Sequence, residues 1–266
     1  NHNVKDVFMF SGGAIMPLID CFYKNDKINY YVNSHEQNCG HAATGYAKSS
    51  GKIGVVLVTS GPGITNCVTP LLDATNDSTP LIVISANVSM DAMGTHAFQE
   101  APAVEITKPV TKWSHLVTEN DNIDEIMNKA FYIANNRKKG SVHIDIPKCI
   151  LNKTYVNRII NKNRGYCKNY KKSHSLNEIG EVIERSIKPV IYAGKGANHV
   201  SDSVRMLSDY FNIPVTTTLH GLGIIDETSP LALQMCGMHG SAAANYALQE
   251  ADCIIGIGAR FDDRTT

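Results

Sequence analysis

The sequence predicts an α/β protein built on doubly wound parallel sheets. Three short apolar runs rich in β-branched residues, Val55–Val58, Leu81–Ile84 and Val142–Ile146, are each bounded by Gly, Pro or Ser. Such runs are typical of strands covered on both faces, as in a parallel sheet. Helical segments lie between them, and from Asp124 to Ala134 apolar residues recur on one helical face. Alternation of strand and helix favours a doubly wound domain.

Length and composition fit this class and exclude others. The chain has 266 residues, 43% hydrophobic and 19% charged, with a formal net charge of 0. A chain of this length forms one large or two ordinary domains and buries about 70–75% of its unfolded surface. The balanced charge does not support a nucleic-acid or membrane partner, and no apolar run approaches the roughly 20 residues of a membrane helix.

The cysteines and histidines are typical of an intracellular protein without a metal of its own. The seven cysteines are odd in number, scattered and free of any CxxC pair, which indicates reduced thiols packed as small hydrophobic side chains. The ten histidines show no metal-ligand spacing. We therefore predict no metal site formed by the chain's own residues.

In chain order, the first expected strands are Val7–Phe10 and Ile28–Val32. The second strand is followed by a helical stretch in which Gly40, Ala43 and Ala47 form a face of small residues. A face of this kind lets another helix approach closely.

Glu36 lies where this strand passes into the helix. Open α/β sheets bind ligands at the carboxyl ends of parallel strands, and a carboxylate is electrostatically favoured near a helix N-terminus. Position alone supports a functional carboxylate and a simple capping glutamate equally.

Glycine-containing turns follow several expected strands. In the segment Thr59–Asn66, Gly61 and Gly63 allow close backbone approach before a helix, which suits either an anion cradle or a plain strand-to-helix turn. It is not a P-loop, because no Gly-Lys-Ser/Thr follows. A second such turn is Ser11–Ala14, and Gly94–Glu100 is a polar loop with an aromatic and an amide side chain.

Between residues 152 and 175 the composition changes. Seven Lys or Arg residues occur there without an acidic residue. A nucleic-acid patch and a solvated linker between domains both fit such a segment. The linker is favoured, because the tyrosines in the segment have no evident platform for stacking bases.

A second α/β unit begins near Leu176. Its turn Gly194–Gly196 after a strand is a weak dinucleotide-binding signal, because the third glycine of the fingerprint is absent. The expected elements, in order, are a helix to about Ser186, the strand Pro189–Ala193, a helix from the glycine turn through Tyr210, and the strands Ile213–Thr217 and Cys253–Ile257.

Taken together, the motifs of both units resemble one family. In order they are GGA, HEQ, GYAxSSGKxGVVLVTSGPGxTN, GTxAFQE, VHIDIPK, KPVIYAGKG, IPVTTTLHGLG and GMHGSAAANYA…ADCIIGIGARFDDR. Except in its basic segment, the chain is similar to the catalytic large subunit of acetolactate synthase (acetohydroxyacid synthase), a thiamine-diphosphate-dependent enzyme. The resemblance implies a thiamine diphosphate pyrimidine-binding domain at 1–151, a basic linker at 152–175 and a truncated, Rossmann-like central domain of the FAD-binding type at 176–266. The C-terminal diphosphate-binding domain is absent.

The resemblance also implies site residues. Glu36 matches the glutamate that hydrogen-bonds the aminopyrimidine of the cofactor and so promotes proton removal from the thiazolium. The implied catalytic residues are Glu36, Gln99 near the thiazolium, Phe98 in the substrate pocket, and Gly13 at the reacting centre. The implied thiamine diphosphate contacts are Glu36, Pro62, Asn66 and Gly12. The implied contacts of a largely structural FAD are Lys138, Gly194, Gly196, Thr218, Leu219, Met238, His239, Gly240 and Arg260. Mg²⁺ would be held through the missing domain.

The activity implied by the resemblance is the condensation of two pyruvates, or of pyruvate and 2-oxobutyrate, with loss of carbon dioxide. These reactions open the synthesis of valine, leucine and isoleucine. The resemblance implies a homodimer or larger assembly and leaves room for a regulatory small subunit. It implies a mitochondrial or plastid location in a eukaryote and a cytoplasmic one in a bacterium. The chain alone is expected to be an inactive fragment.

Several positions depart from the family pattern. Ser11 replaces a proline before the first glycine pair, Asn87 replaces a glutamine, and Ser89 replaces a proline. His96 stands where the family has aspartate, and Lys138 where it has an arginine whose planar fork lysine lacks. These departures leave two alternatives: a non-catalytic binding or regulatory relative, and another 2-oxo-acid carboligase such as a glyoxylate carboligase.

Overall fold

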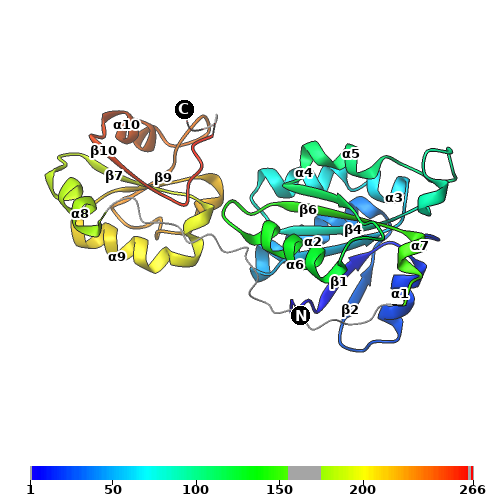
Figure 1. Ribbon diagram of the computed structural model, residues 1–266. Helices are drawn as coiled ribbons and strands as arrows, with labels where there is room; N and C mark the ends of the chain where they lie inside the picture. Colours follow the sequence, from blue (N-terminus) through cyan, green and yellow to red (C-terminus); the bar gives the residue numbers. More distant parts are fainter. Residues whose placement is uncertain (1, 155–174, 263–264, 266) are drawn as a thin grey trace. The chain divides into compact units, whose positions relative to one another are not determined.

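A computed structural model describes residues 2–154, 175–262 and 265, and these form two compact units (Figure 1). The first unit holds the described residues up to 154, and the second holds those from 175 onward. The interior of the expected basic linker lies outside the described residues. Each unit is described here by itself.

The first unit is built on one sheet of parallel strands. Its strands are β1 (Asp6–Met9), β2 (Asn29–Val32), β3 (Gly54–Val58), β4 (Leu81–Asn87), β5 (Trp113–Leu116) and β6 (Ser141–Pro147). They form a six-stranded sheet in the order β2-β1-β3-β4-β6-β5, and every neighbouring pair is parallel. The predicted fold class is confirmed for this unit.

Helices cover both faces of this sheet, as the doubly wound prediction requires (Figure 1). One face is covered by α1 (Met16–Tyr23), α6 (Ile123–Asn135) and α7 (Lys148–Leu151). The other is covered by α2 (Glu36–Ser50), α3 (Pro62–Thr65), α4 (Val68–Asn76) and α5 (Ala103–Thr107). Two separate apolar clusters, one on each face, make the core.

The small residues of α2 explain how closely this helix packs. A Cβ added at Gly40 would lie 2.4 Å from the Pro70 ring of α4, and one added at Gly54 would lie 2.4 Å from the Ala43 carbonyl oxygen. Ala43 and Ala47 are buried. The predicted close-approach face is therefore confirmed, with α4 and β3 as its partners.

Two strands were not expected from the sequence. One is β5, in which all four residues of Trp113–Leu116 are half-buried at the edge of the sheet. The other is β9 (Ala232–Met235), an edge strand of the second unit whose pairing is interrupted by a register shift. Short edge strands lack the continuous apolar run that identifies a central strand.

The second unit is a smaller parallel sheet. Its strands are β7 (Pro189–Ala193), β8 (Val215–Thr217), β9 and β10 (Cys253–Ile257), in the order β10-β7-β8-β9. The helices α8 (Leu176–Arg185) and α9 (Ser201–Phe211) pack on one face and α10 (Ala242–Glu250) on the other. This order is that of the first four strands of a dinucleotide-binding domain, so the Rossmann-like prediction is confirmed.

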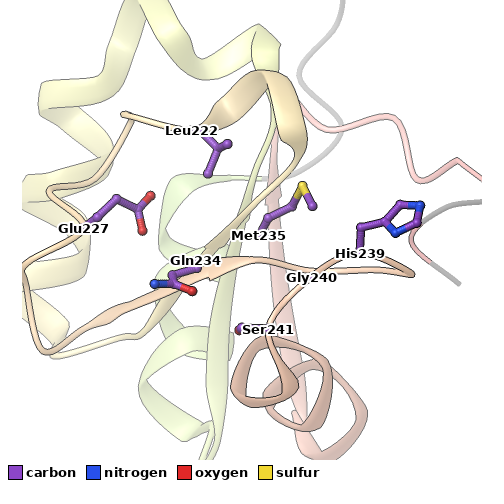
Figure 2. Close-up of a pocket in the computed structure, with 7 residues that line it drawn as sticks. All are labelled: Leu222, Glu227, Gln234, Met235, His239, Gly240 and Ser241. Atoms are coloured by element: carbon purple, nitrogen blue, oxygen red, sulfur yellow. The ribbon is translucent and has the colours of Figure 1, made fainter.

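Local sequence explains where these helices begin. Ser175 and Glu178 form a capping box at the start of α8, in which each side chain binds the other residue's backbone N–H. The expected helix after the glycine turn is divided, because a 3₁₀ helix, η3 (Lys195–Val200), precedes α9. The end of β9 and the segments that follow β8 and β9 line an open pocket of about 310 Å³ (Figure 2).

Across the described residues, no helix combines the length and apolarity needed to cross a membrane.

Cys39, Cys67 and Cys236 are buried free thiols, as the cysteine pattern predicts.

Candidate active site

The order of strands in the first sheet defines where a ligand would bind. The chain winds outward from β1 to β2 on one side and from β3 through β4 on the other, so the sheet reverses direction between β1 and β3. Crevices outside the carboxyl ends of strands at such a reversal are the usual ligand sites of open α/β sheets. All predicted residues of the thiamine site follow the carboxyl ends of the first four strands: Gly12 and Gly13 after β1, Glu36 after β2, Pro62 and Asn66 after β3, and Phe98 and Gln99 after β4.

Glu36 and Asn66 lie together at this edge of the sheet. Glu36 is the first residue of α2, is only 6% exposed, and follows the cap residue His35, which accepts a hydrogen bond from the Gln37 N–H. Asn66 Nδ2 donates to Glu36 Oε2 at 3.0 Å. Within the described residues, Glu36 Oε1 has no hydrogen-bond partner. The arrangement therefore holds one carboxylate oxygen and leaves the other for a ligand.

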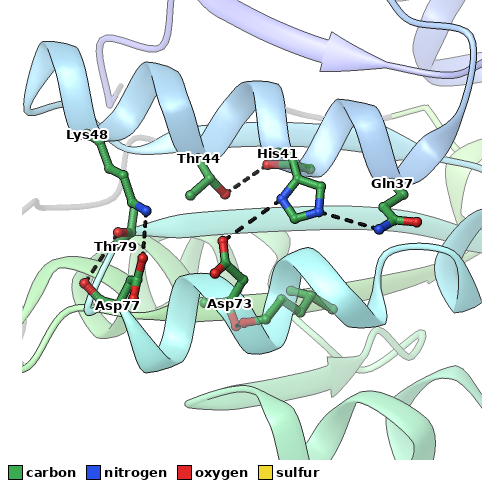
Figure 3. Close-up of polar contacts among 10 residues, drawn as sticks. Gln37, His41, Thr44, Lys48, Asp73, Asp77 and Thr79 are labelled. Carbon is green, nitrogen blue, oxygen red and sulfur yellow. Dashed lines mark hydrogen bonds and ion pairs between the residues drawn. The ribbon is translucent and has the colours of Figure 1, made fainter. Parts of the chain in front are cut away.

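Side chains of α2 make polar contacts with α4, with the residue that follows α4, and within α2 itself (Figure 3). Lys48 Nζ binds Asp77 Oδ2 at 2.6 Å, and His41 Nδ1 lies 3.9 Å from Asp73 Oδ2. Thr44 Oγ1 is buried and donates to the Gly40 carbonyl one turn earlier. Together with the Gly40 contact, these interactions fix the helix that carries Glu36.

The glycine turn after β1 is pressed against the end of β3. A Cβ at Gly12 would lie 2.4 Å from Thr59 Cβ, whereas one at Gly13 would meet nothing within 4 Å. Thr59 is buried, and its Oγ1 has no hydrogen-bond partner among the residues that the structure describes. A buried, unpaired hydroxyl is costly. This hydroxyl and the open side of Gly13 fit a polar ligand at the reversal point.

The turn after β3 makes a second close approach. Gly61 has a φ of +57°, and a Cβ there would lie 2.7 Å from the Gln99 carbonyl oxygen. The turn leads into α3, which has only four residues, and the Gly63 N–H already donates to Ser60. The structure therefore favours a strand-to-helix turn over an anion cradle, and it brings Gln99 to the same edge as Glu36.

Gln99 lies in a loop that is tied to itself. Its φ is +59°, and the following Glu100 carboxylate accepts hydrogen bonds from the backbone N–H groups of Gly94 and Ala97. These donors hold the pKa of Glu100 below its usual range. Phe98 is 88% exposed, so this unit does not by itself enclose the substrate pocket predicted for it.

The substitution Gly61→Ala should destabilise the first unit by about 2 kcal/mol, because a methyl group would strain the backbone and displace Gln99. Urea unfolding measures the change. Gly45→Ala is the matched control, since Gly45 is helical, exposed and has nothing within 4 Å of an added Cβ. Equal stability of the two variants would show that Gly61 and Gln99 are not in close contact.

The predicted FAD contacts of the second unit also share one edge. Gly194 and Gly196 follow β7, Thr218 and Leu219 follow β8, Met238, His239 and Gly240 follow β9, and Arg260 follows β10. This sheet reverses direction between β7 and β10. Gly194 N–H donates to the Ile257 carbonyl, which joins the two strands at that point.

Packing inside the unit accounts for three of these glycines. A Cβ at Gly194 would lie 2.5 Å from Ala259 Cα, one at Gly196 would lie 2.9 Å from Gly258 Cα, and one at Gly240 would lie 2.3 Å from the Met235 carbonyl oxygen. Their residue type therefore reports on close backbone contact and is not by itself evidence of a nucleotide.

Two other observations in this unit do fit a ligand. Thr217 Oγ1, at the end of β8, is buried and has no hydrogen-bond partner in the described part of the chain. The pocket of about 310 Å³ has His239 and Gly240 in its wall, and Figure 2 shows Glu227 and Gln234 on the side away from the imidazole. The complete lining is Leu222, Glu227, Gln234, Met235, His239, Gly240 and Ser241. A pocket of this size would accept one part of a dinucleotide.

The remaining predicted FAD contact is Lys138. It lies in the first unit, in the turn between α6 and β6, and its carbonyl accepts a hydrogen bond from Lys112 Nζ at 2.7 Å. That turn is at the amino end of β6, the edge opposite Glu36. Within the described residues no group of three or more His, Cys, Asp or Glu side chains could hold a metal ion.

Comparison with known proteins places the chain in a family. Residues 1–106 match the N-terminal TPP binding domain of thiamine pyrophosphate enzymes, and residues 176–266 match the central domain of the same enzymes. The chain therefore belongs to the thiamine pyrophosphate enzymes.

Within that family the chain is similar to acetolactate synthases. The mitochondrial catalytic subunit of Saccharomyces cerevisiae is 44% identical over 99% of this chain and 40% of its own length. The large subunit of Lactococcus lactis is 44% identical over 98% of the chain and 46% of its own length. The chloroplastic enzyme of Zea mays is 40% identical over 99% of the chain and 42% of its own length. The resemblance inferred from motifs is confirmed, and the chain spans less than half the length of these relatives.

Proposed function

We propose that this chain is the N-terminal and central part of an acetolactate synthase catalytic subunit. The whole protein would condense two pyruvates, or pyruvate and 2-oxobutyrate, with loss of carbon dioxide. The observation that carries the proposal is the Glu36–Asn66 pair at the reversal point of the first sheet, with one carboxylate oxygen free of partners among the described residues. The names of the similar proteins supply the reaction.

Thiamine diphosphate, when bound, supplies a carbon acid and an electron sink for decarboxylation and carbon–carbon bond formation. The role of this chain is to move one proton. Glu36 Oε1 would hold a proton at the aminopyrimidine, while the Asn66 amide fixes Glu36 Oε2. Burial of Glu36 excludes water from that proton. Thr59, Gly12 and Gly13 would contact the thiazolium ring of the cofactor.

The remaining site residues take roles around this centre. Gln99, held against the Gly61 turn, would face the reacting carbon, and the exposed Phe98 would cover substrate when a further surface of the assembly closes over it. Pro62 would contact the cofactor from the first position of α3. We also propose a homodimer or larger oligomer, because the exposed Phe98 leaves this side of the site open to a second surface, and a regulatory small subunit as a further partner.

FAD is proposed for the carboxyl edge of the second sheet. Thr217 and Thr218 at the end of β8 and His239 at the pocket would contact it, and Arg260 follows the neighbouring β10. Mg²⁺ and the cofactor's diphosphate would bind to a part of the protein outside these residues. The similar proteins are mitochondrial, chloroplastic or bacterial, and we propose an organelle for a eukaryotic source and the cytoplasm for a bacterial one.

The test is a steady-state assay of the full-length protein with pyruvate, thiamine diphosphate, Mg²⁺ and FAD. We expect acetolactate to form and the purified protein to carry flavin absorbance. Faster turnover of glyoxylate than of pyruvate would assign the protein to another carboligase. Absence of turnover with either acid, in a folded protein that binds the cofactor, would indicate a non-catalytic relative.

A further inference from the structure

The sheet of the first unit carries a row of buried polar side chains on the face covered by α4 and α5. In β6 the residues Val142, Ile144 and Ile146 pack in the apolar cluster with α6. The alternate residues of this strand and of β4 point to the opposite face: Ser141, His143 and Asp145 from β6, and Ser85 and Asn87 from β4. All five are buried, although the sequence predicts a mostly apolar strand here.

Asp145 is the charged member of this row. Asp145 is only 1% exposed, and its two carboxylate oxygens have different partners. Ser85 Oγ donates to Oδ1 at 2.5 Å, and Asn87 Nδ2 donates to Oδ2 at 2.6 Å. Within the described residues it forms no ion pair, so these two neutral donors hold it.

Asn87 connects this carboxylate to the loop that contains Gln99. Its Nδ2 also donates to the Ala101 carbonyl at 3.4 Å, and its Oδ1 accepts from the Val88 N–H at 2.8 Å. Both ends of the amide are therefore engaged, and its orientation is determined. Ala101 lies two residues beyond Gln99 and just before α5.

His143 and Thr107 complete the arrangement from the side of α5. Ser85 has one proton, and it is given to Asp145, so His143 Nε2 donates to Ser85 Oγ at 2.8 Å. His143 Nδ1 lies 2.8 Å from Thr107 Oγ1, whose single proton is shared between this nitrogen and the Ala103 carbonyl at 2.9 Å. The imidazole is neutral in this arrangement, and burial lowers the pKa of His143 to about 3.

We propose that Asp145 and Asn87 are positioning residues for Gln99. The buried carboxylate orients the Asn87 amide, and the amide holds the Ala101 carbonyl, so the loop is fixed beyond Gln99. The Gly61 turn fixes it at Gln99 itself, and the Glu100 carboxylate fixes it before Gln99. The role of Gln99 in catalysis rests on the proposed function. The claim that Asp145 and Asn87 hold the loop in place does not.

Hydrogen exchange in the full-length protein tests whether Asn87 and Asp145 hold the loop in place. In Asn87→Leu, backbone amides of residues 94–100 should exchange about tenfold faster or more, because local opening of the loop becomes easier. Asn87→Gln, which restores the amide, should recover most of the protection. Ser141→Ala is the matched control: it removes a buried polar side chain of the same row, bonded to Leu71 and Thr75 and not to the loop, and should leave these amides unchanged.

Three outcomes would overturn the inference. They are unchanged exchange in Asn87→Leu, an equal effect of Ser141→Ala, and loss of protection throughout the unit with none specific to the loop. If Asn87→Leu does not fold, Asn87→Ala serves, because it removes both amide contacts without adding volume.

Kinetics of the full-length protein separate this inference from the proposed function. Asn87→Leu should lower kcat about tenfold or more with little change in KM for pyruvate, since a misplaced catalytic group affects the chemical step more than binding. Loss of loop protection with unchanged kcat would overturn the role for Gln99. A wild-type protein without acetolactate-forming activity would refute the proposed function and leave the exchange result valid.

Discussion

The substitution Glu36→Gln is expected to lower the acetolactate-forming kcat of the full-length protein about 10²–10⁴-fold. Glutamine has nearly the same shape, and its carbonyl oxygen can still accept the hydrogen bond from Asn66 Nδ2. Its amide nitrogen would then stand where Glu36 Oε1 stands, as a donor in place of an acceptor. The proton at the aminopyrimidine would have no base to hold it.

The matched control for this substitution is Glu105→Gln. Glu105 is also a first-turn glutamate, in α5, but it is exposed and is not part of the proposed machinery. Rates from initial-velocity assays and urea midpoints should be measured for both variants. Unchanged kcat in a folded Glu36→Gln protein would refute the role assigned to Glu36, whereas loss of stability alone would identify it as a structural cap.

The substitution Asp145→Asn is expected to make the free energy of unfolding strongly dependent on pH. In the wild type, Asp145 and His143 together contribute almost no pH dependence. Burial raises the pKa of Asp145 to about 6, against weaker lowering by the Ser85 and Asn87 hydrogen bonds, and the Glu105 charge raises it slightly. Burial lowers the pKa of His143 to about 3. Both pKa shifts favour the uncharged form of the group, as burial does.

The signs of the two contributions are opposite. Between about pH 4 and 6, the folded state has a proton on Asp145 that the unfolded state lacks, so this contribution to stability is lost as pH rises through 6. Over the same range the unfolded state has a proton on His143 that the folded state lacks, so that contribution is lost as pH falls. The two cancel in the wild type.

In Asp145→Asn only the histidine contribution remains. Its free energy of unfolding should fall by about 1.4 kcal/mol per pH unit on acidification from pH 6 to 4, about 3 kcal/mol in all, relative to the wild type. His143→Gln should show the opposite slope over the same range. Urea unfolding at several pH values measures both, and parallel profiles for the two variants would contradict the assignment.

Much of the fold could be predicted from the sequence. The central strands β3, β4 and β7 and the helix α6 have apolar patterns that depend on neighbours close in the chain, so they were predicted within a few residues. The edge strands β5 and β9 were missed, because a half-exposed strand of four residues has no such pattern. The sequence does not predict the polar face of β6, because His143 and Asp145 lie within one short, mostly apolar run.

The site was predicted in a similar way. Glu36, Gly61 and Gln99 stand in segments with recognisable motifs, and the structure brings them to one edge of the sheet. Thr59 and Asn87 were not identified as site residues from the sequence. Their importance arises from an unpaired hydroxyl in one case and from a bridge to Asp145 and Ala101 in the other. Alternation of polar and apolar residues in β6 is the signal that could have indicated the buried row.

The sequence by itself determined the class of fold, the order of most elements, the family, and which turns carry chemically useful residues. These properties follow from local periodicity and from motifs of adjacent residues. Only the tertiary structure decided which turns meet, because that depends on strand order. The reversal between β1 and β3 places Gly12 against Thr59, and Asn66 against Glu36 thirty residues earlier in the chain. Contacts across such separations arise when whole strands and helices pack, and no local pattern contains them.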